Sequence, residues 1–247
     1  MSRFFGFILS PLHHLDFFFT LIVFQPIQWL SYKIGGYKAH KVSVDILNYF
    51  LKGAYYVLGG TIKFVNDQDL PTDRPIIFTA NHQSMYDIPP MIWFLRKHHA
   101  KFISKIELTK NIPSISFNLK YGGGANIDRK DRKQSLGEIM KLGERMNKNN
   151  WSAVIFPEGT RSKDGRMKEF QLGGIATILK KAPNALIVPI AIENSWKVVQ
   201  NGTLWLHAFV PLRFTVLKPI EPIGRDIAEL VKEAEMAVRA VVEREYR

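Results

Sequence analysis

The pattern of apolar and polar residues divides the chain near residue 60. Between Phe4 and Leu30 the sequence has no Lys or Arg and a single carboxylate, Asp16. Beyond residue 60, short apolar runs alternate with segments whose apolar residues recur at helical spacing. Short strands separated by helices indicate a layered α/β domain. We therefore expect a helical segment over residues 1–60 and an α/β domain over residues 61–247.

The expected fold is a mixed central sheet flanked by helices. A helix is also expected over residues 42–58, ended by Gly59 and Gly60. In the domain, strands are predicted at 61–65, 75–79, 101–104, 125–127, 152–156, 186–192 and 208–216. Helices are predicted at 88–97, 106–118, 134–147, 172–180 and 225–245.

The first 30 residues suggest a membrane anchor. A spanning helix needs about 20 predominantly apolar residues, whereas Pro11, the pair His13–His14 and Pro26 interrupt this stretch. A signal peptide would need a basic start and a small-residue cleavage site, which the sequence does not offer. We expect aromatic-rich helices, bent near the prolines, that lie in one leaflet. A single membrane span, or a simple cover for the core, remains an alternative.

A candidate catalytic pair lies at the end of the predicted strand 75–79. His82 follows this strand, and Asp87 precedes two prolines and a helical pattern, as an N-cap residue would. Folded back onto the imidazole, the carboxylate would fix the tautomer and stabilise the imidazolium. On spacing alone, an ordinary loop histidine and a plain helix cap are the better explanation of the two residues.

Two sequence motifs, which occur in the same order as in a known family, favour the catalytic interpretation. The stretch from His82 to Asp87 resembles the HxxxxD motif of the glycerolipid acyltransferase family, and 156–162, Phe-Pro-Glu-Gly-Thr-Arg-Ser, resembles that family's other signature. The resemblance runs over residues 61–210 and is nearest to bacterial 1-acyl-sn-glycerol-3-phosphate acyltransferases. It implies that His82 is the general base and that Asp87 orients it.

The resemblance also implies a binding site for a phosphorylated acceptor. Arg129 matches the family's second block, although Asn126 stands where a bulkier residue is usual. The substrate-binding residues that it suggests are Lys105, Arg129, Glu158, Gly159, Thr160 and Arg161. Lys105 could instead be a solvated surface lysine, and Arg129 could pair with Asp128 or Asp131. Glu158 and Arg161 could form a local salt bridge. Residues 186–190 resemble the family's fourth motif and would shape a pocket.

The amino-acid composition excludes several kinds of site and partner. The 247 residues carry a formal net charge of +12 and no cysteine, so disulfides, thiolate metal ligands and a cysteine nucleophile are excluded. A basic surface attracts polyanions. The basic run 129–133 has no interleaved aromatic residues, so we expect no nucleic-acid partner. His13–His14 and His98–His99 lack partners at ligand spacing, and no metal is expected. Ser84 lacks the surroundings of a nucleophile elbow.

The expected reaction is direct acyl transfer from acyl-CoA or acyl carrier protein to lysophosphatidic acid, without a cofactor. A backbone N–H of the motif loop could serve as the oxyanion donor. The expected location is the cytoplasmic face of the inner or plasma membrane. An acyltransferase for glycerol-3-phosphate or another lysolipid is an alternative, as is a non-catalytic protein that binds anionic lipid. The oligomeric state is left open.

Overall fold

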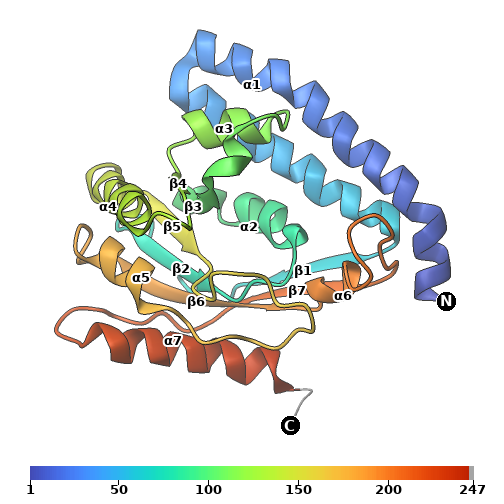
Figure 1. The fold of residues 1–247 in the computed structure, drawn as a ribbon. Coiled ribbons are helices and arrows are strands. Elements are labelled where there is room, and N and C mark those ends of the chain that lie inside the picture. Colours follow the sequence, from blue (N-terminus) through green and yellow to red (C-terminus); the bar gives the residue numbers. More distant parts are fainter. Residues whose placement is uncertain (245–247) are drawn as a thin grey trace.

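The computed structural model describes residues 1–244 and shows a seven-stranded sheet between two helical layers (Figure 1). The strands are β1 (Thr61–Val65), β2 (Ile76–Ala80), β3 (Ala100–Lys105), β4 (Ala125–Ile127), β5 (Ser152–Ile155), β6 (Leu186–Glu193) and β7 (Pro211–Val216). The α-helices are α1 (Ser2–Ala54), α2 (Ile88–Phe94), α3 (Ile115–Tyr121), α4 (Arg132–Asn149), α5 (Leu172–Leu179), α6 (Ser195–Val198) and α7 (Ile227–Val242).

The sheet is mixed, which confirms the predicted α/β fold. Its strand order is β1-β7-β6-β2-β5-β3-β4. Neighbouring strands run parallel except β6 and β7, which are antiparallel. The carboxyl ends of β6, β2, β5, β3 and β4 therefore share one edge, which is where open α/β sheets place their sites.

Each face of the sheet buries its own apolar cluster. One face packs against α2 and the end of α1, through residues such as Tyr55, Phe78 and Met91. The opposite face packs against α4, α5 and α7, through residues such as Leu142, Ile178 and Leu230. Strands such as Ile76–Ala80, buried at every position, are apolar on both sides because both faces are covered.

The N-terminal helix α1 is a hairpin whose turn lies at Gly36. This residue has φ +62° and ψ −156°, outside helical geometry, in a region that glycine adopts readily and other residues avoid. Pro11 and Pro26 both lie inside the helix, and the bends expected near them stay a prediction. The two arms run antiparallel in Figure 1, and Phe24 contacts Phe50 across them.

The inner side of the hairpin packs on the domain and its outer side is apolar and exposed. Phe17, Leu21 and Leu47 belong to a buried cluster that also contacts Met85 and Ile115. Exposed side chains on the first arm include Phe4, Phe5, Phe7, Ile8, Leu12, Leu15, Phe18, Phe19, Ile22, Trp29 and Leu30. The helix is long and apolar enough to cross a membrane by length and composition. The boundary between anchor and domain at residue 60 stays a prediction.

Three predicted elements differ from the structure. The helix expected over 106–118 is a short 3₁₀ turn, Ile106–Thr109, followed by a break and α3. Pro113 and Ser114, which has φ +60°, lie in this break. The strand expected from residue 208 begins at Pro211. Helix α7 ends at Val242, and the predicted end at residue 245 lies outside the described residues.

Candidate active site

The loop after β2 brings His82 and Asp87 together. The Nδ1 atom of His82 lies 2.8 Å from Oδ2 of Asp87, and the Asp87 side chain is fully buried. The loop is fixed at its start by Asn81. The amide of Asn81 donates to the backbone carbonyl of Ile192 and accepts from the Ile192 N–H, at 2.8 and 2.7 Å. Strands β2 and β6 are thereby joined at the edge of the sheet where the pair sits.

The Asp87 carboxylate accepts four hydrogen bonds. Its Oδ2 accepts the backbone N–H groups of Gln83 and Ser84, at 2.8 and 3.0 Å, besides the imidazole. Its Oδ1 accepts the hydroxyl of Ser195, at the start of α6. A buried carboxylate without such donors would carry a large desolvation cost. Because both oxygens are hydrogen-bonded, the carboxylate has a single orientation toward His82.

The expected capping role of Asp87 is wrong. No side-chain hydrogen bond caps α2 from Asp87. The residue instead ends a short 3₁₀ turn, Met85–Asp87, whose cap is Ser84. The carboxylate therefore turns back into the loop, where it can reach the imidazole.

The imidazole of His82 has one defined tautomer. A carboxylate only accepts, so Nδ1 carries the proton. The guanidinium Nε–H of Arg161 donates to His82 Nε2 at 3.3 Å, so Nε2 presents its lone pair. The ring stacks on Phe156, with 4.0 Å between the centroids. The side that a substrate could approach is thus the side that Arg161 occupies.

Glu158 connects the two motif loops. Its carboxylate accepts the backbone N–H of His82 at 2.8 Å and that of Lys168 at 2.9 Å. Burial raises the pKa of Glu158, and these two hydrogen bonds partly oppose that rise. The salt bridge between Glu158 and Arg161, which the sequence offered as an alternative, does not form among the described residues, since Glu158 contacts backbone and Arg161 contacts His82. The backbone between them turns at Gly159, where φ is +71°.

The other predicted cations line the same edge of the sheet. Lys105 ends β3 and Arg129 follows β4, and both are exposed. With strands about 4.8 Å apart, β3 lies about 10 Å and β4 about 14 Å from β2. Asp128 accepts the Lys130 N–H, and Asp131 caps α4. Within residues 1–244 Arg129 pairs with neither carboxylate, unlike the alternative considered from sequence.

The motif loop has few N–H groups left for an oxyanion. The N–H of His82 donates to Glu158, and the N–H groups of Gln83 and Ser84 donate to Asp87. The N–H of Tyr86 goes to the Ser84 side chain. The Asp87 N–H contacts the Ser84 carbonyl. Most of the backbone N–H groups that were expected to serve as the oxyanion donor therefore already have an acceptor within the protein.

Sequence reasoning missed Ser195 and Phe156 as site residues. Ser195 lies just beyond the apolar block 186–190, which had been assigned to pocket walls. A hydroxyl shortly after a strand at the active edge was the available signal. Pro189 belongs to this block although strand β6 is interior to the sheet. Its ladder with β7 begins one residue later, at Ile190, so the missing N–H removes no bond from that ladder.

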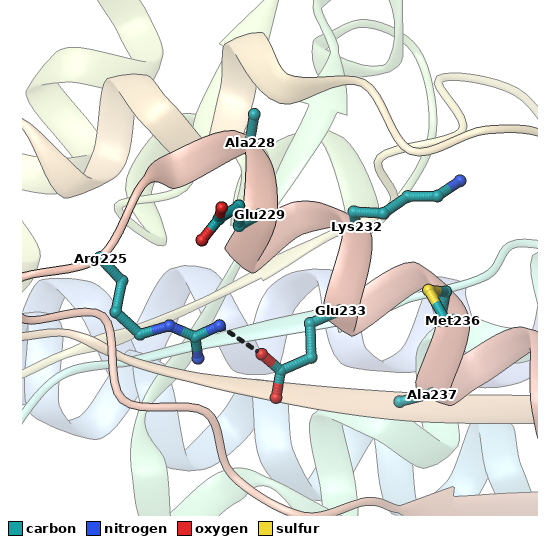
Figure 2. A pocket seen from close by; sticks show the side chains of 7 residues that line it. All are labelled: Arg225, Ala228, Glu229, Lys232, Glu233, Met236 and Ala237. Atoms are coloured by element: carbon teal, nitrogen blue, oxygen red, sulfur yellow. Dashed lines mark hydrogen bonds and ion pairs between the residues drawn. The ribbon is translucent and has the colours of Figure 1, made fainter.

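A hollow along α7, the helix that covers the opposite face of the sheet, contains none of these site residues. It lies along α7 and is lined by Arg225, Ala228, Glu229, Lys232, Glu233, Met236 and Ala237 (Figure 2). Arg225 donates to Glu233 across it at 2.6 Å. Within residues 1–244 no group of three His, Asp or Glu side chains could hold a metal ion.

The fold and the site define a class of α/β protein with a buried His–Asp pair at a cation-lined sheet edge. The profile of the acyltransferase family matches residues 61–193. The chain belongs to the acyltransferase family.

Similar proteins carry related names. A chloroplastic 1-acyl-sn-glycerol-3-phosphate acyltransferase of Arabidopsis thaliana is 30% identical over 161 residues, which cover 65% of this chain and 44% of that protein. A 1-acyl-sn-glycerol-3-phosphate acyltransferase of Helicobacter pylori is 33% identical over 132 residues, 52% of each chain. The chain thus spans less than half the length of the plant relative that it matches.

A solved structure supports the same fold. The crystal structure of the 1-acyl-sn-glycerophosphate acyltransferase of Thermotoga maritima aligns with a TM-score of 0.80 and 23% identity. The alignment covers 100% of this chain and 98% of that one. At this identity the likeness establishes the shared fold.

Proposed function

We propose that this chain transfers a fatty acyl group from acyl-CoA or acyl carrier protein to the sn-2 hydroxyl of 1-acyl-sn-glycerol-3-phosphate, giving phosphatidic acid. The observation that carries the proposal is the buried Asp87–His82 pair, whose Nε2 lone pair meets Arg161. A base beside a guanidinium suits an acceptor that has both a hydroxyl and a phosphate. The names of the relatives agree with this acceptor.

The proposed step needs no covalent enzyme intermediate. His82 Nε2 takes the proton of the acceptor hydroxyl as its oxygen attacks the thioester carbonyl. The C–O bond forms, the C–S bond breaks, and the proton passes from the imidazolium to the departing thiolate. Asp87 stabilises the imidazolium meanwhile. A thiol is a fair acid, so the leaving group needs little assistance.

The acceptor phosphate is assigned to the cations of the sheet edge. Arg161 would bind it with two hydrogen bonds, and Lys105 and Arg129 would add charge from β3 and β4. The backbone of Gly159 and Thr160 would approach the acceptor. Glu158 would act by holding the His82 backbone, in addition to the acceptor contact implied by family resemblance. The site would bind acyl donor and acceptor together and use no metal or cofactor.

The hairpin α1 is assigned to the cytoplasmic leaflet of the inner or plasma membrane. Acyl chains leave lipid at a cost of about 0.8 kcal/mol per CH₂. A helix whose outer face is apolar can lie in the interface and admit the acceptor sideways from lipid. The net charge of +12 favours an anionic membrane surface.

An assay of purified protein in lipid tests this function. Lysophosphatidic acid is supplied with acyl-CoA or acyl carrier protein, and phosphatidic acid is measured. His82→Ala should lower the rate by about 10²–10⁴-fold, and binding to vesicles should be unchanged. His14→Ala, at a histidine outside the site, is the matched control. Equal rates for His82→Ala and the unchanged protein would refute the proposed chemistry.

A further inference from the structure

The segment after α6 carries exposed apolar side chains that the acyl-transfer site does not use. Leu204 is 64% exposed, Trp205 40% and Phe209 51%. These side chains, together with the backbone between them, form what we term the 204–209 segment. Isolated exposed apolar residues need no explanation, whereas a contiguous patch marks an interaction surface.

The 204–209 segment is fixed to the first turns of α1. Trp205 stacks on Phe7 with 4.2 Å between ring centroids, and Phe209 meets Phe5 edge-on at 5.4 Å. The Leu206 N–H donates to the hydroxyl of Ser10 at 2.8 Å. In Figure 1 this loop, beyond α6, lies beside the N-terminal end of α1. The aromatic side chains are therefore held in place against the helix.

Gly6 allows the backbone of the 204–209 segment to lie directly against α1. A Cβ at Gly6 would lie 1.9 Å from the backbone oxygen of Leu206, so no other residue fits there. Phe5 and Phe7 project on either side of Gly6, because successive residues are about 100° apart around a helix. Phe209 and Trp205 consequently lie on opposite flanks of α1. They widen its exposed apolar face on both sides.

We propose that the 204–209 segment enters the same phospholipid surface as the outer face of α1 and forms a second membrane contact. The proposal rests on the membrane association included in the proposed function. Lipid fits because the segment continues the face of α1 that carries no Lys or Arg from Phe4 to Leu30. Tryptophan and other aromatic side chains favour the level of the headgroups. A second copy of the chain is the alternative occupant.

This contact would connect the membrane to the active site along the chain. Ser195, which donates to Asp87, begins the short helix α6, and the 204–209 segment follows it. The residue that holds the Asp87 carboxylate and the 204–209 segment, which would contact lipid, are thus joined by one short stretch of chain.

The absence of cysteine allows a direct test with single labels. Leu204→Cys is compared with Phe19→Cys on α1, 63% exposed, and with Ile223→Cys before α7, 71% exposed. Each full-length protein carries an environment-sensitive fluorophore in phosphatidylcholine–phosphatidylglycerol vesicles. We expect nitroxide-labelled lipid to quench the labels at 19 and 204 at least several-fold more than the label at 223. Aqueous iodide should quench only the label at 223.

Each other outcome overturns the proposal in a recognisable way. A label at 204 that responds to iodide, while the label at 19 responds to lipid, removes the second contact and leaves the anchor intact. Iodide quenching at both 19 and 204 removes the anchor as well. Protection at 204 from both quenchers assigns the segment to a second protein copy. Acyl transfer by the same labelled proteins reports separately on the proposed chemistry.

Discussion

Tyr86, the residue before Asp87, donates its hydroxyl to His13 in the first arm of α1, with 2.8 Å between the oxygen and Nε2. The Nδ1 of the same ring lies 2.9 Å from the Ala54 carbonyl in the second arm. A carbonyl only accepts, so Nδ1 donates and Nε2 accepts. Burial lowers the pKa of His13, which favours this neutral form. One imidazole thus joins both arms of the hairpin to the catalytic loop.

Removing the Tyr86 hydroxyl should destabilise this junction. Tyr86→Phe leaves a buried ring nitrogen of His13 without a donor, at a cost of about 1–3 kcal/mol. The midpoint of thermal unfolding in detergent should fall by about 2–4 °C per kcal/mol. Tyr56→Phe, in which the tyrosine is 47% exposed, is the control and should change little. Equal midpoints for both variants would argue against the His13 connection.

Ser195 is expected to act as a positioning residue for Asp87. Ser195→Ala removes the donor to Oδ1 and leaves the carboxylate with its contacts on the other oxygen. Because a hydrogen bond to a charged group contributes about 1.5–3 kcal/mol, kcat should fall about 10-fold or more. The acceptor KM should stay constant, and Ser195→Thr should restore part of the rate. A rise in KM with unchanged kcat would assign Ser195 to substrate binding instead.

Arg161 is expected to contribute mainly to acceptor binding. Its Nε–H donates to the His82 nitrogen that must take a proton, so the acceptor phosphate would have to draw the guanidinium away from that nitrogen. Arg161→Ala should raise the KM for lysophosphatidic acid about 10- to 100-fold, the equivalent of one charged hydrogen-bonding contact. Lys163→Ala, an exposed cation on the same loop, is the control. An unchanged acceptor KM would contradict the assigned role.

The sequence predicted those features that neighbouring residues determine. The strand before His82 is a continuous apolar run, and the five-residue spacing to Asp87 lets a short loop close on itself. Both follow from local chain geometry. Strands that alternate with helices tend to run parallel, so the loops that carry Lys105 and Arg129 were expected at the edge of the sheet where the strands end.

Contacts between residues far apart in the sequence could not be predicted, because no local pattern marks them. Ser195 lies 108 positions from Asp87, and no local pattern connects them. The sequence led us to expect bends near the prolines of α1, whereas the turn that closes the hairpin lies at Gly36. The helix predicted over 106–118 is interrupted at Pro113 and Ser114, and the Ser114 hydroxyl donates to the carbonyl of Leu21 in the distant α1.

His99, whose Nε2 lies 2.6 Å from the hydroxyl of Tyr37 at the tip of the hairpin, should make stability depend on pH. Burial, reinforced by Lys101 and Lys41, lowers the pKa of His99 to about 3, whereas an unfolded histidine has a pKa near 6.5. The unfolded state therefore binds more protons than the folded state between pH 3 and pH 6.5, so stability is lost as pH falls from about 6.5 toward 3.

The midpoint of thermal unfolding should be lower at pH 5 than at pH 7.5. In His99→Asn this difference should shrink, because asparagine tolerates the left-handed backbone at φ +51° and does not titrate. An undiminished difference in the variant would assign the pH dependence to other groups, such as His40, whose pKa burial lowers to about 4.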